Sequence, residues 1–283
     1  MSKQTGVFFH YQNGERLLDF PQALDGILER DNLLFYEGLY PGSPPSYFNL
    51  QPLSLDQVYE VHSREMVEEV MLSDAFEGAL YSASGTVGAV ERILDGNIDN
   101  AFVFTGYGDH HAGTTFFGGG CYFNGAAIAI NQMRRKYPGS RVAIIDTDAH
   151  HGNGTWEIFQ EDTETFYTCL CSEKFQERNG KLNIQVNKPI DDHDYIELVR
   201  DYCVPKLKAF DPDLIFWNWG YDGTLGDYGD MGITNQCHID LASELRSCAE
   251  YICEGRLVVV LCGGRRRDIA RDVIPRIIRV LCE

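Results

Sequence analysis

The sequence VAIIDTDAHHGNGT occupies residues 142–155 and sets an apolar run directly against a cluster of carboxylates and imidazoles. A short apolar run bounded by polar residues predicts a strand that is buried on both faces of a sheet. In open α/β sheets, ligands bind beyond the carboxyl ends of the strands. The stretch therefore predicts a buried parallel strand with a functional site at its end.

The same organisation recurs along the chain. Further short runs rich in β-branched or aromatic residues predict strands at residues 6–10, 101–105, 166–170, 214–217 and 257–261. Helical patterns occupy residues 55–60, 64–73, 84–94, 121–136, 194–210 and 241–253. This alternation predicts an α/β fold in a single domain over residues 1–283, with a mostly parallel central sheet and helices on both faces. Polar clusters follow four of the strands and would meet at one edge of the sheet.

Asp148 and His150 are candidate metal ligands. They are two residues apart, so in an extended stretch both side chains point to the same side. Buried carboxylates need partners or metals, and one oxygen donor beside one nitrogen donor suits zinc. Asp222 follows the predicted strand at 214–217 and would be a third ligand, which leaves the open position of a catalytic zinc. The alternative is a hydrogen-bonded loop in which the carboxylates cap helix N-termini.

A second cluster, His110 and His111, follows the predicted strand at 101–105. Two adjacent imidazoles offer two bases, and the glycines at 118–120 let the backbone approach a ligand closely. A histidine pair is often only structural, but its position at the same edge of the sheet favours a role in the site. Asp227 has no such position, and we expect it in a solvent-facing loop.

Composition narrows the class of protein. The formal net charge is −18, so direct nucleic-acid binding through a basic face is not expected. The nine cysteines form no CxxC pair, although Cys169 and Cys171 stand two apart in a predicted strand, and they fit free thiols in a reducing compartment. Residues 1–10 lack a basic-then-apolar leader, and no window reaches ~18 uninterrupted apolar residues. We expect a cytoplasmic protein without membrane contacts; the sequence does not indicate its oligomeric state.

Assembled, these segments resemble the histone deacetylase and acetylpolyamine amidohydrolase superfamily, over about residues 58–264. Three blocks carry the resemblance: His110-His111-Ala112 with Gly119-x-Cys121-Tyr122-Phe123-Asn124, Asp146-x-Asp148-x-His150-His151-Gly152-Asn153-Gly154-Thr155, and Gly220-Tyr221-Asp222. The asparagine at 153 is similar to class II and bacterial members. The resemblance implies the three-layer fold that these enzymes share with arginases.

The resemblance also implies roles for single residues. Zinc would be bound by Asp148, His150 and Asp222. The histidine pair would handle the protons of the attacking water, with Asp146 as the partner of His110 and Asn153 as the partner of His111. A structural K⁺ would lie near Asp146, and the carbonyl of Gly119 would accept the substrate's amide N–H. The implied reaction is hydrolysis of an N-acyl amide, in an N-acylated small molecule or acyl-lysine.

The sequence departs from the family at the end of the last predicted strand. Arg265 stands where the family places a tyrosine that stabilises the oxyanion. The arginine would donate to the oxyanion, clamp an acidic group of the substrate, or lie in solvent at a basic helix start; weak catalysis is a further possibility. Gly120 replaces a common aromatic, so one wall of the acyl channel is thinner, and no proline-glycine loop follows residues 166–170.

Two other functions stay open. An arginase-like dimanganese ureohydrolase shares the sheet architecture but needs more bridging carboxylates than Asp222 and Asp227 supply. A zinc-dependent module that binds an acyl ligand or a partner without turnover would tolerate the missing tyrosine, because losing one oxyanion donor lowers the rate without removing the ligand site.

Overall fold

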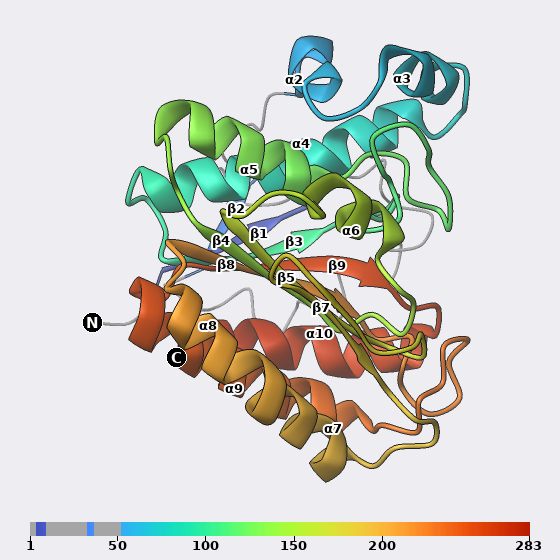
Figure 1. Cartoon of the computed structure of the whole chain (residues 1–283), viewed down its shortest axis with the longest axis vertical. Coiled ribbons are helices and arrows are strands. Elements are labelled where there is room, and N and C mark those ends of the chain that lie inside the picture. Colours follow the sequence, from blue (N-terminus) through green and yellow to red (C-terminus); the bar gives the residue numbers. More distant parts are fainter. Residues whose placement is uncertain (1–3, 10–32, 37–51) are drawn as a thin grey trace.

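A nine-stranded sheet is the middle layer of the described part of the chain (Figure 1). The computed structural model describes residues 4–9, 33–36 and 52–283. The strands are β1 (Thr5–Phe8), β2 (Leu33–Tyr36), β3 (Asn100–Phe104), β4 (Val142–Asp146), β5 (Thr165–Cys171), β6 (Gln176–Arg178), β7 (Lys181–Gln185), β8 (Leu214–Gly220) and β9 (Leu257–Gly263). Their order is β2-β1-β3-β9-β8-β4-β5-β7-β6, and every neighbouring pair is parallel except β6 with β7.

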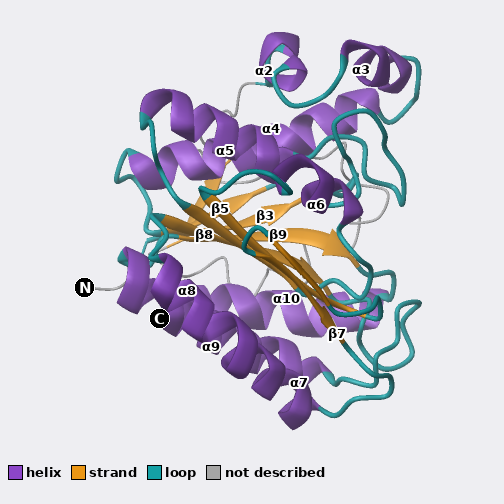
Figure 2. Cartoon of the chain, viewed as in Figure 1, coloured by secondary structure: helices purple, strands orange, loops and turns teal. Residues whose placement is uncertain are grey.

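Helices cover both faces of the sheet (Figure 2). One face carries α4 (Phe76–Leu94), α5 (Gly125–Lys136) and α6 (Asn153–Phe159), with α2 (Leu55–Tyr59) and α3 (Arg64–Met71) outside them. The other face carries α7 (Asp192–Leu198), α8 (Val204–Phe210), α9 (Asn235–Cys253) and α10 (Arg267–Cys282). A π-helical turn, η2 (Val199–Cys203), joins α7 to α8. The predicted α/β fold with a mostly parallel sheet between helices is confirmed; the domain bounds 1–283 stay a prediction.

Alternate residues of single strands build two separate cores. On β3, Phe102 and Phe104 pack toward α9 and α10, while Ala101 and Val103 pack toward α4 and α5. All five residues of β3 are buried. Burial on both faces explains why the strands read as unbroken apolar runs instead of alternating ones.

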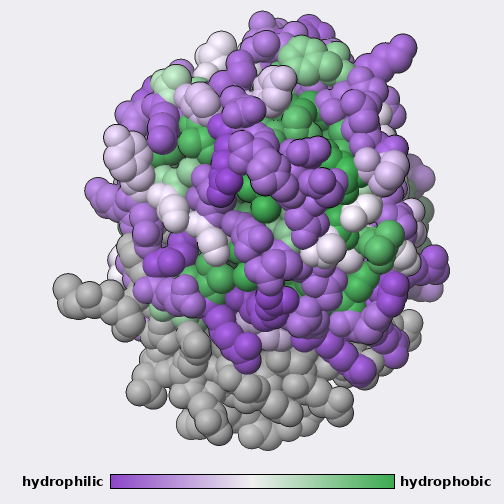
Figure 3. Space-filling model, turned by 90° about the horizontal axis from the view of Figure 1, so that it is seen from below, coloured by the Kyte–Doolittle hydropathy of each residue, from purple (hydrophilic) through white to green (hydrophobic). Residues whose placement is uncertain are grey.

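The face of the molecule drawn in Figure 3 is largely polar. Hydrophilic residues predominate there, and hydrophobic ones show as small separated areas. Among the described helices, none combines the length and the apolar character needed to cross a bilayer.

Element boundaries differ from prediction where side chains cap or extend the elements. The helix expected at 121–136 begins at Gly125, because the side chain of Asn124 accepts a hydrogen bond from the Ala127 N–H and ends the preceding loop. The predicted helix at 84–94 begins earlier, at Phe76. In the strand expected at 6–10, His10 lies outside the described residues. The β6–β7 hairpin, α6 and α10 were not predicted.

A buried histidine joins the end of β8 to α9. The indole N–H of Trp219 donates to Nδ1 of His238 over 3.1 Å, and Thr224 Oγ1 lies 2.8 Å from His238 Nε2. Because Nδ1 accepts, the neutral ring carries its proton on Nε2 and donates to Thr224. Burial lowers the pKa of His238 to about 4.

This histidine makes stability depend on pH. Between pH ~6.5 and about 4, His238 is protonated in the unfolded chain but neutral in the native state. The free energy of unfolding therefore decreases by ~1.4 kcal/mol for each unit by which the pH is lowered in this range. When the pH is lowered from 7.5 to 5, we expect wild type to lose ~2 kcal/mol more of its free energy of unfolding than His238→Gln, which has no group to protonate at this position. Urea unfolding at both pH values measures it. Identical pH dependence in the two proteins would contradict the assignment.

Candidate metal and hydrolytic site

Three predicted metal ligands meet at the carboxyl ends of two neighbouring strands. β4 pairs with β8 so that Asp146 is opposite Asn218, and the loops that follow carry Asp148 and His150 on one side and Asp222 on the other. Donor atoms of Asp148, His150 and Asp222 all lie within 4.8 Å of one another. His150 Nδ1 is 2.8 Å from Asp222 Oδ2 and 3.2 Å from Asp148 Oδ1.

This donor set fits a divalent cation. Both carboxylates are almost fully buried, at 1% exposed for Asp148 and 0% for Asp222. Asp222 Oδ1 accepts from the Ala149 N–H, but Oδ2 is buried without a hydrogen-bond donor despite its closeness to His150. Burial, and then the charge of Asp148, raise the pKa of Asp222. A cation among these atoms would satisfy the orphaned oxygen and offset the repulsion between the carboxylates.

Two glycines make room for these carboxylates. A Cβ on Gly220 would lie 2.2 Å from Asp148 Oδ2 and 2.7 Å from Asp222 Oδ1. A Cβ on Gly263, at the end of β9, would lie 2.0 Å from Asp148 Oδ2. Any side chain at either position would displace the triad, so the glycines at the two strand ends belong to the site.

The histidine pair lies beside the triad and its two members have different environments. His110 Nδ1 is 2.9 Å from Asp146 Oδ2, which also accepts from the hydroxyl of Tyr167 at 2.9 Å. His111 Nδ1 is 2.7 Å from Asn153 Oδ1. The two imidazole rings are 4.2 Å apart between centroids. The structure thus brings together the residue pairs expected from the sequence.

These environments separate the two pKa values. Burial lowers the pKa of His110, but the charges of Asp146 and Asp148 outweigh burial and raise it to about 9. Burial and the neighbouring His110 lower the pKa of His111. The pKa of one imidazole is therefore raised and that of its neighbour lowered, which is an arrangement suited to moving protons.

The glycine turn passes over the second histidine. Gly119 has φ +60°, and a Cβ there would lie 2.5 Å from His111 Cδ2. Gly120 also has a positive φ, of 82°, and the turn is closed by paired hydrogen bonds between Gly118 and Cys121. Only residues without a side chain permit this close approach of backbone to ring.

Arg265 makes no contact with the triad among the interactions of the described residues. Its side chain is exposed, and within the described residues no hydrogen bond or ion pair connects it to Asp148, His150 or Asp222. Its backbone N–H donates to Asp227 Oδ2 over 3.1 Å.

The expectation that Asp227 lies in solvent is wrong. The residue is only 6% exposed, and its Oδ2 accepts from the backbone N–H groups of both Arg265 and Arg266, the latter at 2.9 Å. Its Oδ1 accepts from the N–H of Tyr228 at 2.7 Å. Asp227 therefore holds together the turn between β9 and α10, at the residues just before the helix begins. No local signal in the sequence identifies an acceptor that comes from 39 residues away.

Tyr228 is the residue of the site that sequence reasoning missed. Its ring stacks on His150, with centroids 5.3 Å apart and 22° between planes. Its hydroxyl accepts from the Gly264 N–H at 3.4 Å and lies 3.2 Å from the position of a Cβ on Gly263, the same point that touches Asp148. Partial burial and the charges of Asp222 and Asp148 raise the pKa of the phenol well above its ordinary value. The phenol therefore keeps its proton beside the triad.

Comparison with known proteins gives the family. The family described as the histone deacetylase domain matches residues 45–281, and the chain belongs to it. It is 26% identical over 291 residues to a probable deacetylase of Archaeoglobus fulgidus, covering 92% of this chain and 81% of the relative. It is 28% identical over 228 residues to the polyamine deacetylase HDAC10 of Mus musculus, covering 74% of this chain and 34% of the relative. The chain thus spans only about a third of the mouse protein.

A solved structure shares the fold. The crystal structure of the HDA15 HD domain superposes with a TM-score of 0.81 and 22% identity, covering 99% of this chain and 89% of that one. Together, the family and the named relatives support a deacetylase or amidohydrolase activity.

The role of Asp227 in the turn before α10 can be tested by matched substitutions. We expect Asp227→Ala to lower the free energy of unfolding by ~1–2 kcal/mol, because it leaves two part-buried N–H donors of that turn without an acceptor. Asp227→Asn keeps one carbonyl oxygen and should lose less. Chemical denaturation of the three proteins measures the order. Equal stability of the alanine variant and wild type would refute this role of Asp227.

Proposed function

We propose that the chain is a zinc-dependent hydrolase of N-acyl amides, with acetyl as the first acyl group to test. The observation that carries the proposal is the convergence of the Asp148, His150 and Asp222 donors beside a histidine pair whose Nδ1 atoms have unlike partners, a carboxylate and an amide. Zinc bound by these three residues would polarise the acyl oxygen and lower the pKa of a water toward ~7.

The histidine pair would divide the proton work. Asn153 Oδ1 accepts the Nδ1–H of His111, which leaves Nε2 of that neutral ring free to take a proton from the attacking water. Asp146 holds the Nδ1–H of His110 in the same way and keeps that ring cationic. The pair then delivers a proton to the leaving amine. During these reaction steps, the carbonyl of Gly119 would accept a hydrogen bond from the substrate's amide N–H.

Tyr228 is our candidate for the second oxyanion donor. Its phenol is protonated, and its oxygen already accepts from the Gly264 N–H, so its own hydrogen is free to be donated. The ring is held by stacking on His150. The hydroxyl thereby borders the triad from the loop after β8, whereas the family's tyrosine would come from position 265. One such donor contributes ~3–4 kcal/mol to transition-state stabilisation.

Arg265 then has a different role. Exposed at the start of the last loop, its guanidinium would attract a carboxylate or phosphate on the substrate at the rim of the site and disfavour a cationic chain. Acyl-lysine is therefore a less favoured substrate than an N-acylated small molecule with an acidic group. The thinner wall at Gly120 leaves space for such a substrate.

The competing proposals have less support. A dimanganese ureohydrolase would need Asp227 as a ligand, but its oxygens are occupied by backbone N–H groups. A non-catalytic acyl-binding module predicts zinc-dependent binding without turnover. The K⁺ near Asp146 stays a prediction; in the structure Asp146 Oδ1 accepts from the Asp148 N–H.

Metal removal tests the central proposal. Chelator-treated protein should lose hydrolysis of N-acetyl amides and regain it with zinc. Asp222→Ala should hold one zinc fewer per chain than wild type and show only background hydrolysis, because it removes a carboxylate from the triad. Metal analysis and circular dichroism accompany the assay, with Asp230→Asn as a nearby control. Full activity of the metal-free protein would sink the proposal, while ligand binding without turnover would favour the binding module.

Tyr228→Phe tests the oxyanion donor. We expect kcat for acetyl amides to fall by ~10²–10³-fold with little change in KM, since the hydroxyl acts on the developing charge. Tyr251→Phe, at an exposed position on α9, is the matched control and should behave as wild type. An unchanged kcat in Tyr228→Phe would exclude the role.

Arg265 is tested with a panel of N-acyl amides that includes acidic ones. Arg265→Ala should raise KM for acidic substrates about tenfold or more and leave neutral ones unchanged, because a charge-assisted contact contributes ~1.5–3 kcal/mol. If Arg265→Tyr improves acetyl-lysine cleavage and neither variant weakens acidic substrates, the clamp is wrong.

A further inference from the structure

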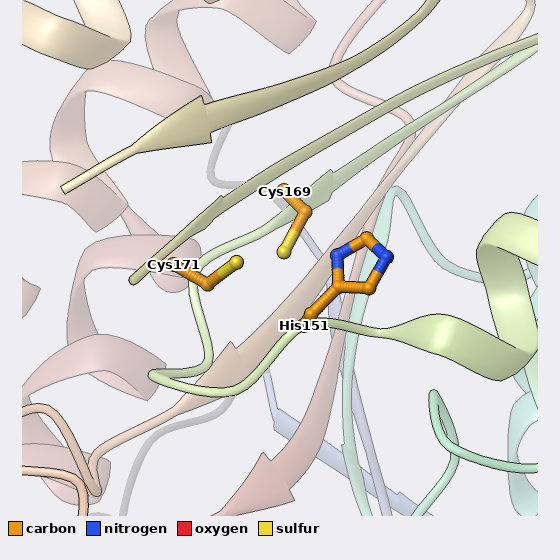
Figure 4. A group of neighbouring side chains, drawn as sticks. All are labelled: His151, Cys169 and Cys171. Atoms are coloured by element: carbon orange, nitrogen blue, oxygen red, sulfur yellow. The ribbon is translucent and has the colours of Figure 1, made fainter. Parts of the chain in front are cut away.

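A second group of metal-binding side chains lies next to the triad and takes no part in the proposed hydrolysis. Donor atoms of His151, Cys169 and Cys171 are all within 4.8 Å of one another (Figure 4). The cysteines are two apart on β5, so their side chains project from the same face of the strand. His151 follows β4, the sheet neighbour of β5. The register of these two strands therefore assembles the group.

The histidine offers an unused nitrogen to the two thiols. His151 Nδ1 is buried and makes no hydrogen bond, and Figure 4 shows the imidazole with a nitrogen facing the sulfur atoms. Trp156 packs against the ring, with centroids 5.5 Å apart, and holds it in place. Both sulfur atoms belong to buried residues. A buried nitrogen without a partner needs an explanation, and a ligand is one.

Asn183 brings an oxygen to the same place. Its side-chain N–H groups donate to the carbonyls of Glu173 and Lys174, at 3.2 and 2.8 Å. These bonds fix the orientation of the amide, so that Oδ1 faces Cys171 Sγ at 3.1 Å. Asn183 Oδ1 is thus a buried oxygen with a fixed orientation that could be the fourth ligand of a tetrahedral metal site.

We propose that His151, Cys169 and Cys171 bind a structural Zn²⁺, separate from the metal of the triad, with Asn183 Oδ1 or water as the fourth ligand. Two thiolates neutralise the charge of Zn²⁺ and the imidazole is neutral, so the occupied site has no net charge to bury. Binding forms two Zn–S bonds and one Zn–N bond, and the two thiol protons go to solvent. Zn–S bonds of ~2.3 Å hold two sulfurs about 3.8 Å apart, which the present spacing reaches by small side-chain rotations.

This site would fix the loop that carries the triad. His150 and His151 are adjacent in that loop, so one belongs to each of the two groups. A zinc that binds only the native state stabilises it by mass action. The proposed ion therefore clamps residues 147–152 to β5 and keeps His150 in position.

Cobalt distinguishes the two sites because only one of them contains sulfur. The full chain, reduced and freed of metal with a chelator, is titrated with Co²⁺. We expect a thiolate-to-cobalt charge-transfer band in wild type and in Asp222→Ala, and its loss in Cys169→Ser and Cys171→Ser. Cys248→Ser, a buried cysteine of α9, is the matched control and should keep the band. Zinc content should fall by one equivalent per chain in each of the two β5 variants.

A second measurement needs no variant. Zinc should protect Cys169 and Cys171 of reduced wild type from alkylation by at least tenfold in rate, as read by mass spectrometry, and leave the labelling of Cys262 unchanged. Absence of the cobalt band in wild type, or equal alkylation of both cysteines with and without zinc, overturns the site. Either result leaves the hydrolytic proposal standing, because that proposal depends on the zinc lost in Asp222→Ala.

Discussion

Two carboxylates buried side by side at the ends of adjacent strands are the constraint on which the rest of this structure depends. Parallel pairing of β4 with β8 puts Asp148 and Asp222 within reach of one imidazole, and no solvent is available to separate their charges. The neighbouring glycines and backbone N–H groups accommodate these two buried carboxylates. Glycines stand at the ends of β8 and β9 because any Cβ would meet the carboxylate of Asp148. The Ala149 and His150 N–H groups donate to the carboxylates.

The same charges set the chemistry of the neighbouring histidines. Carboxylates on two sides of His110 overcome the cost of burying its cation, while His111, whose partner is an amide, does not receive this compensation. The same carboxylates thus help to separate the pKa values of two adjacent imidazoles. The neutral partner Asn153 is as important here as the charged partner Asp146, since a carboxylate at both positions would make the two rings alike.

The sequence predicts the parts of this arrangement that depend on local periodicity. Apolar runs locate β3, β4, β5, β8 and β9, and the alternation of side chains puts Asp148 and His150 on one side. Asp227 and Tyr228 escape prediction because their surroundings are set by α10 and Gly264, more than 35 residues later in the chain. The spacing of Cys169 and Cys171 within one strand can be recognised in the sequence. The proximity of His151 cannot be recognised there, because only the register of β4 with β5 brings it to the two cysteines.

Asp227 has a mechanical consequence. One carboxylate accepts from its own loop at Tyr228 and from the two residues just before α10, a helix of sixteen residues packed along the sheet. The loop that carries Tyr228 is therefore tied through Asp227 to the turn before α10, and we expect the two to move together. Substrate entry would have to come from rotations of single side chains or from the opposite wall at the glycine turn. The side of the site that contains Tyr228 is therefore preorganised before the substrate binds.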